Sequence, residues 1–118
     1  VGMRGKYVIT GGTFNCWLTC REGEMIINGG TCTGVINADL DGRITINNMT
    51  VETKTKYNWL DPKYYICLYV GEGGSIQVNG GTFTAKGGYG YRKEAGGTIT
   101  FGVSNPASLF NVKELEYK

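Results

Sequence analysis

Histidine is absent from this 118-residue sequence, so carboxylates and cysteines are the main candidates for chemistry. Without histidine, neither a Ser–His nor a Cys–His nucleophile pair can form. Glycosidases need two carboxylates, and three acidic residues precede repeated strands at similar distances: Glu22, Asp41 and Glu72. If they stack on neighbouring turns of the chain about 4.8 Å apart, their spacing resembles that of the two carboxylates in a retaining glycosidase. Any two acidic residues at such a corner would show the same spacing, so the spacing alone does not indicate catalysis. We therefore expect no catalytic residue here.

The sequence also gives little support for a metal site. The stretch Asp39-Leu40-Asp41-Gly42 resembles the start of a calcium loop but lacks the remaining ligands, and a tight turn explains it better. The cysteines form no Cys-x-x-Cys pair, which argues against structural zinc. We expect neither a metal nor another cofactor.

The four cysteines can form two disulfides or serve as small apolar core residues. Strand alternation predicts that Cys16, Cys20 and Cys32 face the interior, and that Cys67 points the other way with Trp17 and Val35. Cys16 and Cys20 on one strand lie about 13 Å apart, too far for a mutual disulfide. Cys32 can pair with Cys16 only if a turn brings the two together.

These side chains are positioned by a motif that recurs four times. The copies are residues 7–14, 25–32, 44–51 and 76–83, and a fifth begins at Ile99 and departs from the pattern at Pro106. Two Gly-favouring positions follow a short polar residue, usually Asn, which predicts a turn with positive φ and a ladder of Asn side chains. The most regular columns are an apolar anchor (Ile9, Ile27, Ile46, Val78, Phe101), an unbroken threonine (Thr13, Thr31, Thr50, Thr82) and a second apolar position (Phe14, Cys32, Val51, Phe83).

The period of the motif indicates the architecture. Successive anchors are 18, 19, 32 and 23 residues apart, and 18 or 19 residues suit one coil of a β-solenoid. A second strand in each coil gives a further inward column of Leu18, Ile36 and Leu68. We predict an all-β fold, a right-handed parallel β-helix of about four to five coils. Residues 1–118 then form a single domain, which can be a segment of a longer protein, with a candidate C-terminal cap at 105–118.

The Gly-Gly-Thr-Phe repeats resemble those of right-handed parallel β-helix repeat proteins, the pectate-lyase-like superfamily. Repeats of this kind are similar to those in bacterial surface proteins and in phage tail and fibre proteins. The resemblance covers residues ~5 to ~104. It implies a fold more than an activity, because this architecture carries lyases, hydrolases, adhesins and inert spacers.

Two insertions interrupt the repeat, and insertions in solenoids emerge as loops, often on the binding face. We expect loops at 53–65 and 86–93, both rich in aromatic and basic residues. Such residues suit stacking on sugars or contact with a protein, although the aromatic side chains can instead fold back to cover the solenoid. The candidate binding residues are Tyr57, Trp59, Asp61, Tyr64, Tyr89, Tyr91 and Arg92.

We expect a non-enzymatic extracellular module for structure or adhesion, at a cell surface or on a virion, that contacts glycan or protein. The alternatives are a polysaccharide-active enzyme or a fragment of one, and an ice-binding solenoid, which the mixed outward column Val8, Ile26, Thr45, Gln77 and Thr100 disfavours. A net charge of +2 argues against nucleic acid, and no apolar run approaches the length of a membrane span. Since a short solenoid exposes its ends, we also expect a homo-oligomer or a larger assembly.

Overall fold

The computed structural model describes residues 5–54 and 65–117. This part of the chain is all-β apart from one short 3-10 helix, η1 (Pro106–Leu109). The strands are β1 (Gly5–Ile9), β2 (Thr13–Phe14), β3 (Leu18–Arg21), β4 (Gly23–Ile27), β5 (Thr31–Cys32), β6 (Ile36–Asp39), β7 (Arg43–Ile46), β8 (Thr50–Glu52), β9 (Ile66–Val70), β10 (Ser75–Val78), β11 (Thr82–Lys93), β12 (Thr98–Phe101) and β13 (Phe110–Glu116).

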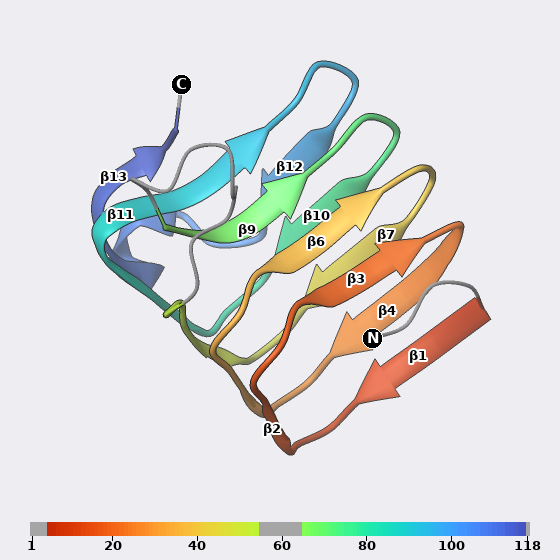
Figure 1. Cartoon of the computed structure of the whole chain (residues 1–118), viewed down its shortest axis with the longest axis horizontal. Helices are drawn as coiled ribbons and strands as arrows, with labels where there is room; N and C mark the ends of the chain where they lie inside the picture. Colours follow the sequence, from red (N-terminus) through yellow and green to blue (C-terminus); the bar gives the residue numbers. More distant parts are fainter. Residues whose placement is uncertain (1–4, 55–64, 118) are drawn as a thin grey trace.

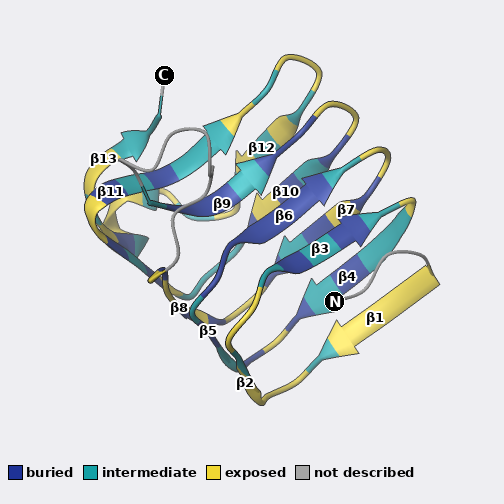
Figure 2. Cartoon of the chain, in the orientation of Figure 1, coloured by how far each residue is buried: buried dark blue, intermediate teal, exposed yellow. Residues whose placement is uncertain are grey.

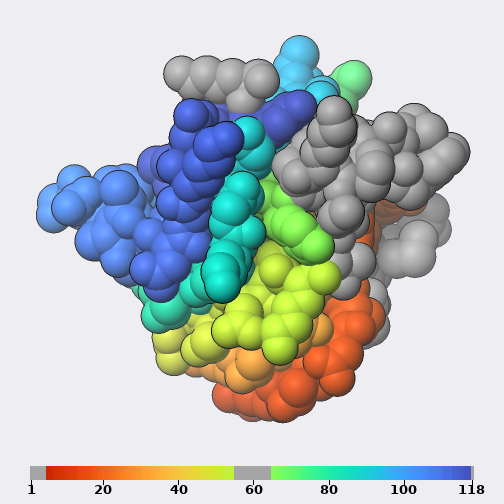
Figure 3. All heavy atoms as spheres, turned by 60° about the vertical axis from the view of Figure 1, so that its left-hand side comes forward, coloured from red at the N-terminus to blue at the C-terminus, as the bar shows by residue number. Residues whose placement is uncertain are grey.

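The strands form two sheets. Sheet A has the order β1-β4-β7-β10-β12; sheet B has the order β2-β5-β8-β11-β9-β6-β3, with β13 also paired to β11. The pairings among the described strands are parallel. Equivalent strands of successive repeats lie side by side (Figure 1), and the sequence runs from one end of the molecule towards the other (Figure 3). The fold is therefore all-β and parallel, an arrangement compatible with a β-solenoid.

Strands of successive repeats pair so that equivalent positions of the motif lie opposite each other. The apolar anchors pair one after another across sheet A, in the order Ile9, Ile27, Ile46, Val78 and Phe101. The threonine column pairs in the same way along sheet B, in the order Thr13, Thr31, Thr50 and Thr82. Equivalent residues of the motif thus become direct neighbours.

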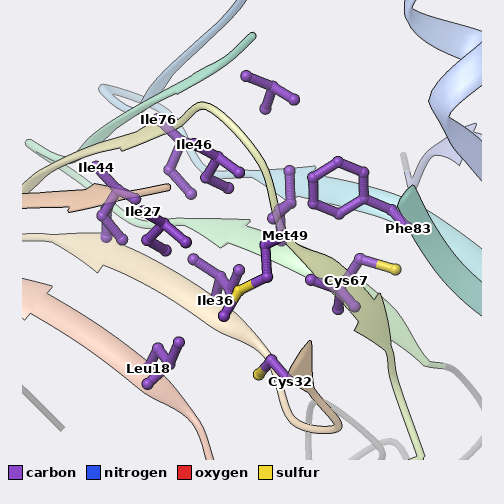
Figure 4. Close-up of a cluster of buried hydrophobic side chains, with 14 of the residues drawn as sticks. Leu18, Ile27, Cys32, Ile36, Ile44, Ile46, Met49, Cys67, Ile76 and Phe83 are labelled. Atoms are coloured by element: carbon purple, nitrogen blue, oxygen red, sulfur yellow. The ribbon is translucent and has the colours of Figure 1, made fainter. Parts of the chain in front are cut away.

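The core lies between the two sheets. Because side chains alternate along a strand, every second residue points inward. The predicted inward column of Leu18, Ile36 and Leu68 is fully buried, which confirms that expectation. Figure 2 shows the buried residues concentrated in the middle strands, and Figure 4 shows their side chains meeting between the sheets.

The Asn-Gly-Gly turns also behave as the sequence predicts. The Asn47 side-chain amide donates to Oδ1 of Asn28 at 2.8 Å, and that of Asn79 donates to Oδ1 of Asn47 at 2.9 Å. The second glycine of the turn adopts a left-handed conformation, with φ of +114° at Gly30 and +115° at Gly81. The ladder and the turn are therefore both present.

Two expectations about cysteine orientation are wrong. Cys16 is exposed, because β3 begins only at Leu18 and strand alternation does not extend back to Cys16. Cys67 is buried in the core between the sheets, whereas Ile66 packs on the outer face with Val35. These two residues begin β9 where the chain turns a corner, so packing decides which way they face. Cys20 and Cys32 are buried as expected.

The segment 86–93 is not a loop, contrary to expectation. It forms the second half of β11, which pairs with β8 at its start and with β9 further along. The extra residues are accommodated by an irregularity between Ala85 and Tyr89, where the register with β13 shifts. Residues 105–118, expected as a cap, contain η1 and the parallel strand β13, and the ring of Phe110 stacks on that of Phe83 at 4.8 Å.

Candidate functional site

A second apolar cluster lies on the outer face of sheet B. Val35 and Ile66 are fully buried at its centre. Four aromatic residues pack against them and remain partly exposed: Trp17, Tyr69, Tyr89 and Tyr117. We call these six residues the outer aromatic cluster. Rings that cover an apolar centre and still reach water are suited to stack on a ligand.

Successive repeats bring the cluster together. Trp17 precedes β3 and Val35 precedes β6, and the N–H of Leu18 donates to the Val35 carbonyl at 2.9 Å. Tyr89 of β11 is the register partner of Ile66 in β9. Tyr117 follows β13, where its N–H donates to the carbonyl of Tyr91 at 2.9 Å. Residues distant in the sequence therefore meet on one face.

A cation completes the aromatic surface. The rings of Tyr89 and Tyr117 meet edge to face, with centroids 4.8 Å apart. The Arg92 guanidinium lies over the Tyr117 ring, 5.1 Å from its centroid, which is a favourable cation–π distance. Its Nε is also 3.0 Å from a carboxylate oxygen of Glu94. Arg92 is thus held in place while it contributes positive charge to the surface.

A polar row runs beside the cluster across four strands. Its outward-facing members are in register, in the order Thr19, Asn37, Tyr69 and Arg92. Asn37 is only 6% exposed, and its Oδ1 accepts no hydrogen bond within the part of the chain that the structure describes. A buried acceptor without a donor is costly and uncommon in folded proteins. Asn37 therefore places a buried amide with an unpaired oxygen next to Tyr69, its register partner.

The structure separates the candidate residues named from the sequence. Tyr89 belongs to the cluster and Arg92 lies on it, whereas Tyr91 packs against the core, with its ring centroid 5.8 Å from that of Phe101. Burial, reinforced by the negative charge of Glu116 and a hydrogen bond with it, raises the pKa of Tyr91 and keeps the phenol protonated. The remaining candidates lie outside the described residues: Tyr57, Trp59, Asp61 and Tyr64.

The sequence correctly predicted that Trp17 and Val35 face outward, but it did not single out Trp17, Tyr69, Asn37 or Tyr117 as candidate binding residues. Trp17 directly precedes β3, and Tyr69 lies in β9. Each is next to an inward-facing residue, Leu18 or Leu68, so strand alternation was the signal that could have placed it on the outer face. Asn37 lies outward between the inward Ile36 and Ala38 in the same way. Tyr117 had no such signal, because the segment that carries it falls outside the repeat motif.

The two corner glutamates do not lie on neighbouring strands. The N–H of Glu22 donates to the Leu40 carbonyl, and the N–H of Leu40 donates to the Glu72 carbonyl. The two glutamates are thus two strand spacings apart, about 9.6 Å along the stack, with Leu40 between them. Asp41 lies in the next row, opposite Gly73. The spacing of Glu22 and Glu72 does not match the ~5 Å separation of a retaining carboxylate pair.

The calcium-loop resemblance is explained by a tight turn. The N–H of Gly42 donates to the Asp39 carbonyl at 2.9 Å, and Leu40 and Asp41 both have positive φ, as in a type I′ turn. The carboxylate of Asp39 accepts two hydrogen bonds from Arg21, at 2.7 and 3.3 Å. Within the described residues, no group of three or more Cys, Asp or Glu side chains is arranged to hold a metal ion.

Burial keeps three of the four free thiols protonated. It raises the pKa of Cys20 and Cys32, and it raises that of Cys67 from 9.0 to about 12. The thiol of Cys32 donates to the Cys16 carbonyl at 3.5 Å. Because folding favours the uncharged form, Cys67 stabilises the fold at neutral pH, and this contribution is lost as pH rises from about 9 to about 12.

We therefore expect the thiols to differ sharply in reactivity. At about pH 8, Cys16 should react with a disulfide reagent such as DTNB at a rate close to that of a free thiol, because it is exposed. Cys20, Cys32 and Cys67 should react at least tenfold more slowly, since each is buried and needs an opening of the fold. Thiol counting over time measures this, and unfolding in guanidinium should release all four. Rapid native reaction of a second thiol, or fewer than four in denaturant, would contradict the assignment.

Searches with this chain match no family model, no curated protein and no solved structure. Among the described residues, no helix has the length and apolar character needed to cross a membrane.

Proposed function

We propose that this chain is a non-enzymatic extracellular module that binds glycan through the outer face of sheet B. The observation that carries the proposal is the outer aromatic cluster, whose four aromatic rings remain partly exposed beside the polar row. Sugars present apolar C–H faces that stack on aromatic rings, and hydroxyl groups that donate to carbonyl oxygens. Thr19, Tyr69 and Arg92 add further polar groups in the same row.

We further propose that the fold is a right-handed parallel β-helix of about four to five coils, related to the pectate-lyase-like superfamily. Its support is the in-register pairing of the repeat columns. Parallel strands joined by a crossover within one sheet are right-handed in about 98% of cases. Such a stack makes a stiff rod, which suits a phage tail or fibre, or a bacterial surface protein, that holds a glycan-binding face away from its base.

Glycan binding is tested by applying the full chain to a glycan array and titrating the strongest ligand while following tryptophan fluorescence. Replacing Tyr69 with alanine should weaken binding about 5- to 30-fold, the effect of losing one stacked ring worth about 1–2 kcal/mol. Tyr7→Ala is the matched control, because Tyr7 is an exposed aromatic residue on β1, away from this face.

Two results would overturn the proposal. If no glycan binds saturably, or if Tyr69→Ala and Tyr7→Ala have equal effects, the outer face is not a glycan site. If the wild-type chain shortens polysaccharides during incubation, the protein is an enzyme rather than a binding module.

A further inference from the structure

Two cysteines from successive repeats meet at one corner of the stack. The thiol of Cys32 donates a hydrogen bond to the backbone carbonyl of Cys16 at 3.5 Å, although the two residues are 16 positions apart in the sequence. Both thiols are free, and Cys16 is exposed whereas Cys32 is buried. A buried sulfur therefore lies against the backbone of the residue that carries an exposed sulfur.

Neighbouring contacts hold the two segments together. The Thr33 hydroxyl donates to Oδ1 of Asn15 at 3.1 Å. A Cβ at Gly34 would lie 2.3 Å from the carbonyl oxygen of Cys16, so only glycine lets the two backbones approach this closely. Residues on both sides of the thiol contact are thus in contact as well, and the segment that carries Cys32 is fixed against the segment that carries Cys16.

The position of Cys16 leaves its side chain able to turn towards this sulfur. β2 ends at Phe14 and β3 begins at Leu18, so Cys16 lies in the connection between them and outside the ladder of either strand. A disulfide needs Cα atoms about 4.4–6.8 Å apart and Cβ atoms that face each other. Because Cys32 already contacts the backbone of Cys16, the change required is a rotation of the Cys16 side chain with a small shift of the connection.

The other two cysteines are engaged elsewhere in the core. Cys20 lies in β3, where its thiol donates to a backbone carbonyl of β7 at 3.7 Å. Cys67 hydrogen-bonds with the Thr53 side chain, and Figure 4 shows its sulfur directed away from Cys32. Both are buried, so a dissolved oxidant does not reach either of them directly.

We propose that Cys16 and Cys32 form a reversible disulfide that ties two successive repeats together in an oxidising environment. The exposed Cys16 thiolate attacks a small-molecule disulfide such as oxidised glutathione, forms a mixed disulfide with it and releases one glutathione thiolate. Cys32 then loses its proton to solvent, attacks the Cys16 sulfur and releases the second glutathione thiolate. The two protein thiols are thereby oxidised by two electrons, and one glutathione disulfide is reduced to two thiols.

The second of these steps is the slower one. Burial raises the pKa of Cys32, so little of it is thiolate at neutral pH, and the thiolate is the attacking species. This agrees with the slow reaction of Cys32 expected with DTNB. Disulfides persist in oxidising surroundings outside the cell, but the pairing itself depends only on the corner geometry and not on glycan binding.

The test starts from the full chain after complete reduction, the state with four thiols. The chain is incubated with oxidised glutathione at about pH 8, quenched with acid and alkylated in denaturant. Mass spectrometry of unreduced chymotryptic peptides identifies the linked cysteines, because cleavage after Trp17 separates Cys16 from Cys20. We expect the loss of two thiols and a single disulfide between Cys16 and Cys32. The same oxidation in urea should favour Cys16 with Cys20, since an unfolded chain closes its shortest loop most readily.

Two variants make the result specific. Cys32→Ala keeps a small apolar side chain in the core, and its oxidation should stop at the mixed disulfide on Cys16. Cys20→Ala is the matched control, because it also removes a buried thiol, and it should form the disulfide as the wild type does. In the wild type, the disulfide should raise the midpoint of urea unfolding by about 1–2 M, since it closes a loop in the unfolded chain.

Three outcomes count against the disulfide. The first is a native wild-type chain that keeps glutathione on Cys16 without an internal bond, and the second is one that links Cys16 to another chain or to a different cysteine. The third is an unchanged or lower midpoint of urea unfolding after oxidation, which would show that the bond distorts the native corner instead of fitting it.

Discussion

Replacing Gly42 with alanine is expected to lower the free energy of unfolding by about 3 kcal/mol, the upper end of ordinary overpacking costs. A Cβ at this position would lie 2.0 Å from the carbonyl oxygen of Cys20. That oxygen belongs to the backbone of the neighbouring strand β3, so no side-chain rotation can relieve the clash. Either the strands separate locally or the turn deforms.

Gly42 belongs to a column of glycines at one corner of the stack. Gly5 and Gly23 are register partners, Gly42 accepts from the N–H of Ser75, and Gly74 accepts from the N–H of Thr98. A Cβ at Gly74 would lie 2.2 Å from the Ala38 carbonyl oxygen. The corner is therefore sharp in successive repeats because the chain passes directly against a carbonyl of another strand.

Gly11→Ala is the matched control. Gly11 has no atom within 4 Å of an added Cβ, so this substitution should change stability by less than about 0.5 kcal/mol. Urea denaturation followed by tryptophan fluorescence measures both variants. If Gly42→Ala is as stable as Gly11→Ala, the close packing of this corner is refuted.

Replacing Phe83 with alanine is expected to cost about 3–5 kcal/mol, because it opens a cavity in the core between the sheets. Phe83 is fully buried, and its ring stacks on that of Phe110 with centroids 4.8 Å apart and an interplanar angle of 21°. Figure 4 shows the ring among the buried side chains of the core. The substitution therefore removes both buried area and an aromatic contact.

Phe83→Leu distinguishes lost volume from lost aromatic stacking. Leucine keeps most of the buried volume, so this variant should lose only about 1–1.5 kcal/mol. The midpoint of urea unfolding should fall for both variants, with the slope unchanged. A loss below about 1 kcal/mol for Phe83→Ala would show that this part of the core collapses or repacks around the missing ring.

The sequence alone was sufficient for the regular part of the molecule. A repeat stacked in register turns each motif position into a column of neighbours, so the pairing of Ile27 with Ile46 and the Asn28–Asn47 contact followed from alignment. The positive φ of Gly30 followed from the absence of a Cβ. Alternation then placed Leu18 and Ile36 inside.

Tertiary structure decided what happens at corners and interruptions. Alternation defines the facing of a side chain only within a strand, so Cys16 before β3 and Cys67 at the start of β9 took their orientations from packing. The irregularity after Ala85 let residues 86–93 continue a strand. The outer aromatic cluster joins residues as distant as Trp17 and Tyr117, which lie on one face only because β3, β6, β9, β11 and β13 pair side by side.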